Sequence, residues 1–193
     1  SEVRLISPSN STKNDRFSGY AGETRAKIQT LSEISLQETP RFTSGFKELD
    51  RVLGGGIVPG SAILIGGHPG AGKSTLLLQV MCGLAKNMTA LYVTGEESLQ
   101  QVAMRANRLN LPTDKLNMLS ETSVEQICNL ADQLKPQIIV VDSIQVMHLS
   151  DIQSSPGSVA QVRECASFLT RYAKTRQVAI IMVGHVTKDG TLA

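Results

Sequence analysis

One stretch of the sequence combines glycines, a lysine and a serine in an order that could bind a chain of phosphates. It reads Gly67, His68, Pro69, Gly70, Ala71, Gly72, Lys73, Ser74. This order matches the G-x-x-x-x-G-K-[ST] pattern, in which glycines let backbone N–H groups converge on phosphate oxygens and a helix N-terminus adds its positive dipole end. We expect Lys73 to reach the β- and γ-phosphates, Ser74 to bind Mg²⁺ through its hydroxyl, and Thr75 to donate to the α-phosphate. The pattern therefore predicts a site for ATP and Mg²⁺ at residues 67–75.

A carboxylate further along the chain could complete the metal site. Four apolar residues at 138–141 are followed by Asp142 and then by Ser143. Many buried strands end in aspartate, but with a phosphate loop upstream we expect Asp142 to hold the metal ion, through water. Ser143 is a polar companion of that carboxylate.

Hydrolysis also needs a group that activates water, and two adjacent glutamates follow residues 90–94. Glu96 lies nearer the end of the expected strand, and we expect it to be catalytic together with Lys73. For Glu97, a favourable interaction with the positive end of the following helix explains the residue equally well. We expect the strand at 90–94 to lie beside the phosphate loop.

These residues need a scaffold, and the apolar pattern predicts one. Short runs rich in Val and Ile at residues 62–65, 90–94, 138–142 and 178–184 suit strands buried on both faces, with a weaker candidate at 116–119. Between them, Ser98, Ser123 and Ser158 each precede a glutamine by three residues, which is the capping-box signal of a helix start. A shorter helix is expected between Phe46 and Leu53, before three glycines. Alternating strands and helices predict an α/β fold, a mostly parallel sheet with helices on both faces.

Composition limits the remaining possibilities. Nineteen Lys and Arg against 17 Asp and Glu give a net charge of +2, which excludes a polybasic tail as the whole explanation. No apolar run approaches the roughly 20 residues that span a bilayer, so we expect a cytoplasmic protein without a membrane partner. Cys82, Cys128 and Cys165 lie far apart within helical patterns and are expected to be buried thiols.

The chain divides near residue 40. Residues 1–40 are rich in polar residues with little periodicity, which predicts a linker or N-terminal arm. Residues 41–193 are expected to form the one ATPase domain, truncated at its C-terminal end.

Taken together, these motifs resemble the RecA-like core of P-loop ATPases, and most closely a bacterial family of recombination and repair proteins within it. The resemblance runs from residues 42–56 through the phosphate loop and residues 92–98 to 142–145, 154–158 and 184–190. It implies a DNA-stimulated ATPase that forms a homo-hexamer with a DnaB-like helicase motor. It also implies binding of single-stranded DNA and branch migration of recombination intermediates. Within this pattern Glu96 activates water and His185 senses the γ-phosphate, although a strand-end histidine can also be structural.

The resemblance places two DNA-facing loops, at residues 147–157 and from Thr187 onward, where ordinary surface connections are the alternative. The first loop has no Lys or Arg, so backbone contacts or the basic residues of the next helix would have to supply positive charge. They are Arg163, Arg171, Lys174 and Arg176. A solvated helix face explains these four residues equally well.

The chain also departs from the family pattern. Family members begin with a four-cysteine zinc module and continue into a Lys-Asn-Arg-Phe-Gly motif and a protease-like domain, and this sequence has none of these. We therefore expect a fragment that starts after the zinc module and stops inside the second loop, and that hydrolyses ATP poorly.

Two alternatives remain open at this point. The first is a nucleotide-gated ring or filament module of the KaiC-like kind, whose output is binding and not translocation. The second is a kinase, because phosphate loops also serve phosphoryl transfer; the Glu pair and the long loop after Asp142 fit water activation and a macromolecular partner better.

Overall fold

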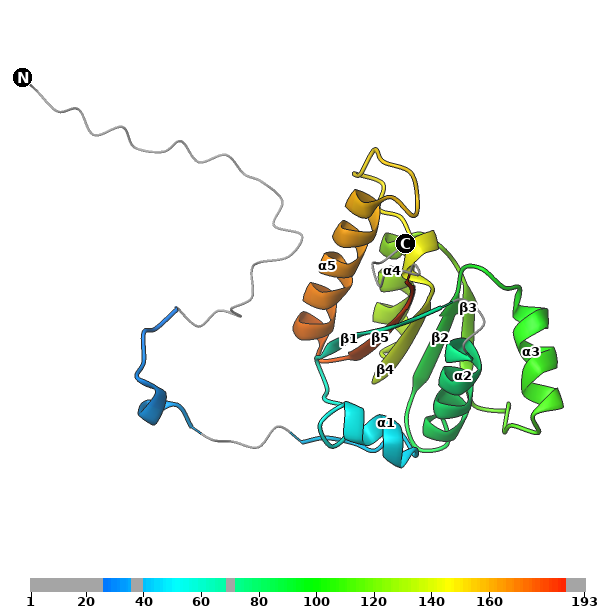
Figure 1. Ribbon diagram of the computed structural model, residues 1–193, viewed down its shortest axis with the longest axis horizontal. Coiled ribbons are helices and arrows are strands. Elements are labelled where there is room, and N and C mark those ends of the chain that lie inside the picture. Colours follow the sequence, from blue (N-terminus) through cyan, green and yellow to red (C-terminus); the bar gives the residue numbers. More distant parts are fainter. Residues whose placement is uncertain (1–25, 36–39, 69–71, 187–193) are drawn as a thin grey trace, which may run out of the picture.

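The computed structural model describes residues 26–35, 40–68 and 72–186, and at its centre is a parallel five-stranded sheet (Figure 1). The strand order is β1-β5-β4-β2-β3, and every pair is parallel. The strands are β1 (Ala62–Gly67), β2 (Ala90–Thr94), β3 (Asn117–Ser120), β4 (Ile138–Asp142) and β5 (Ala179–His185). Parallel strands bring all their carboxyl ends to one edge, which is where open α/β sheets bind ligands.

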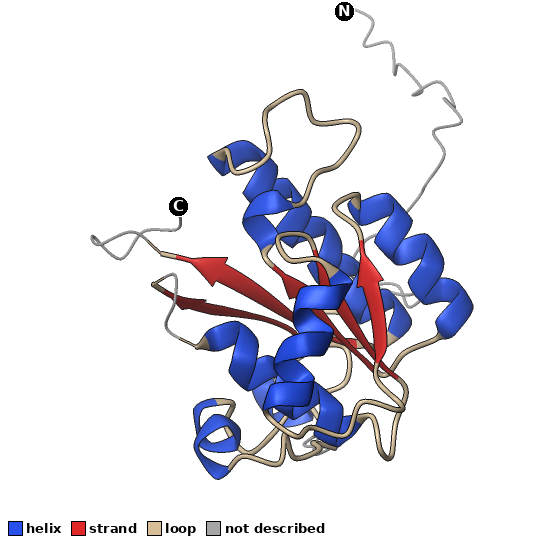
Figure 2. Ribbon diagram, turned by 90° about the vertical axis from the view of Figure 1, so that its right-hand side faces the viewer, coloured by secondary structure: helices blue, strands red, loops and turns tan. Residues whose placement is uncertain are grey.

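Helices cover both faces of the sheet (Figure 2). The α-helices are α1 (Lys47–Val52), α2 (Lys73–Leu84), α3 (Leu99–Arg108), α4 (Val124–Leu134) and α5 (Val159–Arg176), with short 3₁₀ turns η1 (Leu31–Glu33) and η2 (Ile144–Val146). Side chains alternate along each strand: Tyr92 and Val140 pack with α2 and α3, while Val93 and Val141 pack with α4 and α5. The sheet therefore carries two separate apolar cores, as the buried strand runs predicted.

The predicted α/β fold is confirmed, and the strands lie within two residues of their expected bounds. Two details of the predicted strand arrangement were wrong. Strand β1 is not buried on both faces: Leu64 is 42% exposed, because β1 is at the edge of the sheet. Strand β2, expected beside the phosphate loop, is separated from β1, the strand that leads into that loop, by β5 and β4. The crossover through α2 carries the chain over the sheet to β2, and α2 packs on β2 and β4.

The three serine signals mark the starts of α3, α4 and α5. The hydroxyl oxygens of Ser98, Ser123 and Ser158 each accept the backbone N–H of the residue three positions later. Of these three helices only α3 has the complete capping box, in which the Gln101 side chain also accepts the N–H of Ser98. At α5 the buried Gln161 side chain is hydrogen-bonded instead to the loop before the helix.

The predicted short helix is α1, and Gly54 follows it with a positive φ of 75°. The three cysteines are buried and unpaired, as expected. Burial raises the pKa of the Cys128 thiol to about 12, which keeps it protonated and unreactive. Within the described residues, no helix is long and apolar enough to cross a membrane.

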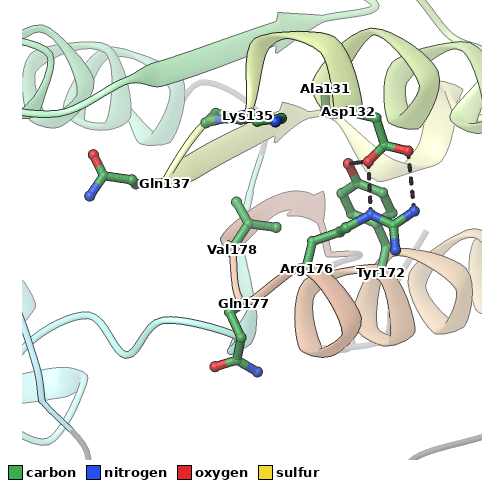
Figure 3. Close-up of a pocket in the computed structure, with 9 residues that line it drawn as sticks. Ala131, Asp132, Lys135, Gln137, Tyr172, Arg176, Gln177 and Val178 are labelled. Carbon is green, nitrogen blue, oxygen red and sulfur yellow. Dashed lines mark hydrogen bonds and ion pairs between the residues drawn. The ribbon is translucent and has the colours of Figure 1, made fainter. Parts of the chain in front are cut away.

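Helices α4 and α5 are joined at their C-terminal ends by a charged contact (Figure 3). Arg176 donates from Nε to Oδ1 of Asp132 (2.9 Å) and from Nη2 to Oδ2 (3.2 Å). The Tyr172 hydroxyl donates to the same Oδ1 at 2.7 Å. Hydrogen bonds from Arg176, followed by that from Tyr172, hold the pKa of Asp132 below its ordinary value. The contact borders a cavity of about 450 Å³ at the amino ends of β4 and β5.

Asp132→Asn tests this contact. The side chains of Arg176 and Asp132 are 44% and 39% exposed, so solvent weakens the pair, and we expect a loss of about 1 kcal/mol in unfolding free energy at pH 7. Because the folded-state pKa is depressed, the stabilisation is complete above about pH 4 and disappears as pH falls through the folded-state value. Urea unfolding at pH 7, 5 and 3 measures this, with the exposed Asp114→Asn as control. A wild-type advantage that persists undiminished at pH 3 contradicts the assignment.

Candidate nucleotide site

The phosphate loop joins the end of β1 to the start of α2. Gly72 has a left-handed φ of 81°, and α2 begins at the next residue, with Ser74 and Thr75 in its first turn. Lys73 turns back over β1: its Nζ donates to the carbonyl oxygen of His68 at 2.8 Å. A Cβ on Gly67 would lie 3.1 Å from Lys73 Cδ, so a side chain there would push the lysine away. Pro69, Gly70 and Ala71 lie outside the described residues.

Asp142 lies at the carboxyl end of β4 and is only 4% exposed. The hydroxyl of Tyr92, fully buried on the neighbouring β2, donates to Oδ2 of Asp142 at 2.7 Å. Burial, and then the charge of Asp142, raise the pKa of Tyr92, so the hydroxyl keeps its proton and acts as the donor. Oδ1 makes no hydrogen bond within the described part of the chain.

Glu96 lies where the ends of three strands meet. Ser143 Oγ, just after β4, donates to Glu96 Oε1 at 2.5 Å. His185 Nε2, at the end of β5, lies 3.2 Å from the same oxygen. His185 is also the register partner of Gly67 on β1. The sequence-predicted Glu96, Ser143 and His185 are therefore in direct contact, and His185 lies between them and the start of the phosphate loop. The peptide bond between Asp142 and Ser143 is cis.

Glu97 has a partner that the sequence did not reveal. Arg105 on α3 donates from Nη1 to Oε2 (2.7 Å) and from Nη2 to Oε1 (3.0 Å) of the Glu97 carboxylate. The predicted interaction with the helix dipole does not describe this contact, because the carboxylate is engaged by a guanidinium two turns along. The sequence did contain one indication that Arg105 faces the interior: it follows Val102 by three residues, so both lie on one face of α3.

The carboxyl ends of β2 and β4 approach each other so closely that only glycine fits at position 95. Its N–H donates to the carbonyl oxygen of Asp142 at 2.8 Å. A Cβ built there would lie 2.6 Å from Cγ2 of Val146 and 3.1 Å from Cε of Met147. Val146 is β-branched and stiff, so it cannot move aside cheaply. Gly95 thus keeps the turn bearing Glu96 against the turn that follows β4.

Gly95→Ala should force these two turns apart. We expect a loss of about 1–3 kcal/mol in unfolding free energy, which is the usual cost of overpacking. Gly83→Ala is the matched control: a Cβ at this exposed helical position meets nothing within 4 Å, and the substitution should stabilise the protein by about 0.5–1 kcal/mol. Chemical denaturation of both variants measures the difference. Equal stability of the two would show that the contact is not restrictive.

A phosphate-loop strand and helix, with acidic residues at the ends of neighbouring parallel strands, define a RecA-like P-loop NTPase fold. A family model described as an AAA domain matches residues 27–191, so the chain belongs to that family. A KaiC-like protein from the hyperthermophilic archaeon Pyrococcus horikoshii OT3 has a similar structure. Its TM-score is 0.65 at 18% identity, over 80% of this chain and 74% of that one. At this identity the likeness concerns the fold.

The sequence is also similar to bacterial proteins described as DNA repair protein RadA. It is 93% identical over 192 residues to the one from Haemophilus influenzae, 72% over 193 residues to that of Escherichia coli, and 47% over 175 residues to that of Bacillus subtilis. The first two alignments cover 100% of this chain but 42% of each relative, and the third covers 90% and 38%. The resemblance to a bacterial repair family is thereby confirmed.

Proposed function

We propose that the protein is an Mg²⁺-dependent ATPase that acts in DNA repair. One observation supports the assignment of ATPase activity. The phosphate loop, Asp142 and the cluster of Glu96, Ser143 and His185 all lie at the carboxyl edge of one parallel sheet. Residues 67–75 bind the phosphates, mainly through backbone N–H groups at the start of α2. Lys73, which reaches back over the loop, contributes its charge to the β- and γ-phosphates.

The residues present suit a magnesium ion. Asp142 offers a nearly buried carboxylate whose Oδ2 is fixed by Tyr92, and Ser74 offers a hydroxyl in the first turn of α2. Hard oxygen ligands of this kind are those that Mg²⁺ prefers, commonly with waters retained. When bound, the ion would neutralise charge on the phosphate oxygens. Ser74 would hold it directly and Asp142 through water.

Glu96 is the general base in this proposal. Its carboxylate takes the proton of the attacking water, while Ser143 Oγ and His185 Nε2 keep it oriented at the edge of the sheet. His185 pairs in register with Gly67 and contacts Glu96, so it is suited to sense the γ-phosphate. Glu97 is engaged by Arg105 and takes no part in the chemistry.

Two substitutions separate binding from hydrolysis. Lys73→Ala should abolish turnover and weaken ATP binding, because the phosphates lose their cation. Glu96→Gln should lower kcat by about 10²–10⁴-fold, since the amide cannot accept the proton, while nucleotide binding is retained. Steady-state ATPase assays and binding of a fluorescent ADP measure both, with the exposed Glu164→Gln as control. Unchanged turnover in Lys73→Ala refutes the site.

The named relatives motivate the second half of the proposal, which concerns DNA. We propose that the protein forms a hexameric ring, binds single-stranded DNA and drives branch migration with a DnaB-like motor. Branch migration that survives Glu96→Gln with nucleotide binding intact would favour the alternative, a KaiC-like nucleotide-gated assembly. The predicted second DNA loop, from Thr187 onward, lies outside the described residues.

The proposed first DNA loop, residues 147–157, is anchored at its base. Met147 is fully buried, and the backbone N–H of Leu149 donates to Gln161 Oε1 at 3.0 Å. Gln161 Nε2 donates to the carbonyl oxygen of Ser154 at 2.8 Å. The Gln161 side chain therefore holds this first part of the loop from the start of α5. Residues 155–157 are free of these contacts and form the part that we propose to face DNA.

Positive charge for DNA would come from the start of α5. Arg163 is exposed in the first turns of the helix, just after the loop. Arg176 lies 13 residues further on, about 20 Å along the helix axis, and is engaged by Asp132. Only the loop-proximal end of the basic helix face is therefore suited to a DNA contact.

Arg163→Ala should weaken binding of single-stranded oligonucleotides and reduce the salt slope of log K by about 0.7, the share of one phosphate contact on single strands. Lys174→Ala, near the far end of the same helix, should change neither. Fluorescence anisotropy titrations between 50 and 200 mM salt, about the range in which such effects are large, give both quantities. Equal slopes for the wild type and Arg163→Ala would exclude this arginine from the DNA interface.

A further inference from the structure

The turn that bears Glu96 is held by hydrogen bonds at Thr94, Gly95 and Glu97. Thr94, which is 1% exposed, donates from Oγ1 to the carbonyl oxygen of Glu97 at 2.9 Å and accepts the N–H of Glu97 at 3.2 Å. Gly95 N–H is bonded to Asp142 O. These bonds close the main chain of residues 94–97 into a compact turn on β2. This turn therefore holds the main chain from which the Glu96 side chain extends to Ser143 and His185.

The turn is also held by a side-chain contact between Glu97 and Arg105. Nη1 donates to Oε2 and Nη2 donates to Oε1, which is the bidentate geometry of a strong charge-assisted pair. The side chains are 16% exposed for Arg105 and 31% for Glu97, so the pair is better shielded from solvent than an ordinary surface ion pair. The hydrogen bonds to Glu97 raise the pKa of Arg105.

The helix that carries Arg105 is itself well anchored. Ser98 and Gln101 form a capping box around its first turn, and Val102 and Ala106 are buried. The Nε–H of Arg105 is buried and has no hydrogen-bond partner among the described residues. The guanidinium thus takes the position that suits Glu97 and leaves one of its own donors unsatisfied.

The pair also separates two carboxylates that follow each other in the chain. Glu96 extends to Ser143 and His185, while Glu97 is drawn to α3 on the other side. Without Arg105, Glu97 would be a second, unpaired carboxylate beside the site where phosphates and Mg²⁺ are proposed to bind. It could then compete for the metal or the water.

We propose that Arg105 is a positioning residue for hydrolysis. By its two hydrogen bonds to Glu97 it stabilises the turn that bears Glu96, and it keeps the Glu97 carboxylate away from the nucleotide. The inference rests on the proposed function, in which Glu96 activates water. Arg105 touches neither nucleotide nor water and acts through Glu97.

Arg105→Met should lower kcat by about tenfold to a hundredfold, the scale expected for a displaced reacting group. The KM for ATP and the Kd for fluorescent ADP should stay within about twofold, because the phosphate loop is untouched. Arg108→Met, exposed and one turn further along α3, is the matched control and should behave as wild type. A kcat within twofold of wild type in folded Arg105→Met overturns the proposal, as does an equal loss of nucleotide affinity.

A double-mutant cycle distinguishes positioning from general support of the fold. Glu97→Gln should lower kcat by nearly the same factor as Arg105→Met, and the double variant should be no worse than either, because the two residues act as a unit. Losses that multiply overturn the proposal. Where Arg105→Met fails to fold, Arg105→Lys decides, since it keeps the charge without the two-pronged grip: a reduced kcat supports the proposal and an unchanged kcat overturns it.

Two variants distinguish the role of Arg105 from the catalytic role of Glu96. Turnover that persists in Glu96→Gln removes the proposed function itself. Turnover that is lost in Glu96→Gln but kept in Arg105→Met leaves the function in place and removes only the role of Arg105.

Discussion

The structure of the site depends on one short contact, the hydrogen bond from the N–H of Gly95 to the carbonyl oxygen of Asp142. It joins β2 and β4 immediately beyond their last paired residues. A side chain at position 95 would separate them, so the approach exists only because glycine has no Cβ. This contact brings together a strand end that carries Glu96 and a strand end that carries Asp142 and Ser143. The chemistry proposed for these residues requires that proximity.

Two acidic side chains of the site are paired with donors on a neighbouring strand and helix. Asp142 is buried but receives a proton donor from Tyr92, and Glu97 receives a guanidinium from Arg105. Of the three acidic side chains at this edge of the sheet, Asp142 and Glu97 have these partners, and Glu96 contacts Ser143 and His185.

The sequence predicted those features that depend on local pattern. Asp142 was identified because it ends an apolar run, and Ser98 because its hydroxyl and Gln101 have capping spacing. The order of the strands was not predictable in this way: nothing in residues 62–65 distinguishes an edge strand from a central one, so the exposure of Leu64 and the separation of β1 from β2 were missed. Arg105 was missed because its contact depends on how α3 crosses the sheet. The spacing of Ser158 and Gln161 predicted a helix start, but the hydrogen bonds from Gln161 to the preceding loop are tertiary contacts, which local spacing does not predict.

The edge position of β1 has a mechanical consequence. Within the described residues β1 pairs with β5 alone, through the six register pairs from Ala62 to Gly67. The phosphate loop grows from β1, whereas Glu96 and Asp142 belong to β2 and β4 on the other side of β5. The two halves of the site are therefore linked through β5, and also through α2, which follows the phosphate loop and packs on β2 and β4. Sliding β5 would break its register pairs with both neighbours, so these two ladders set the spacing between the phosphate loop and Glu96, and His185 lies at the end of the strand that joins them.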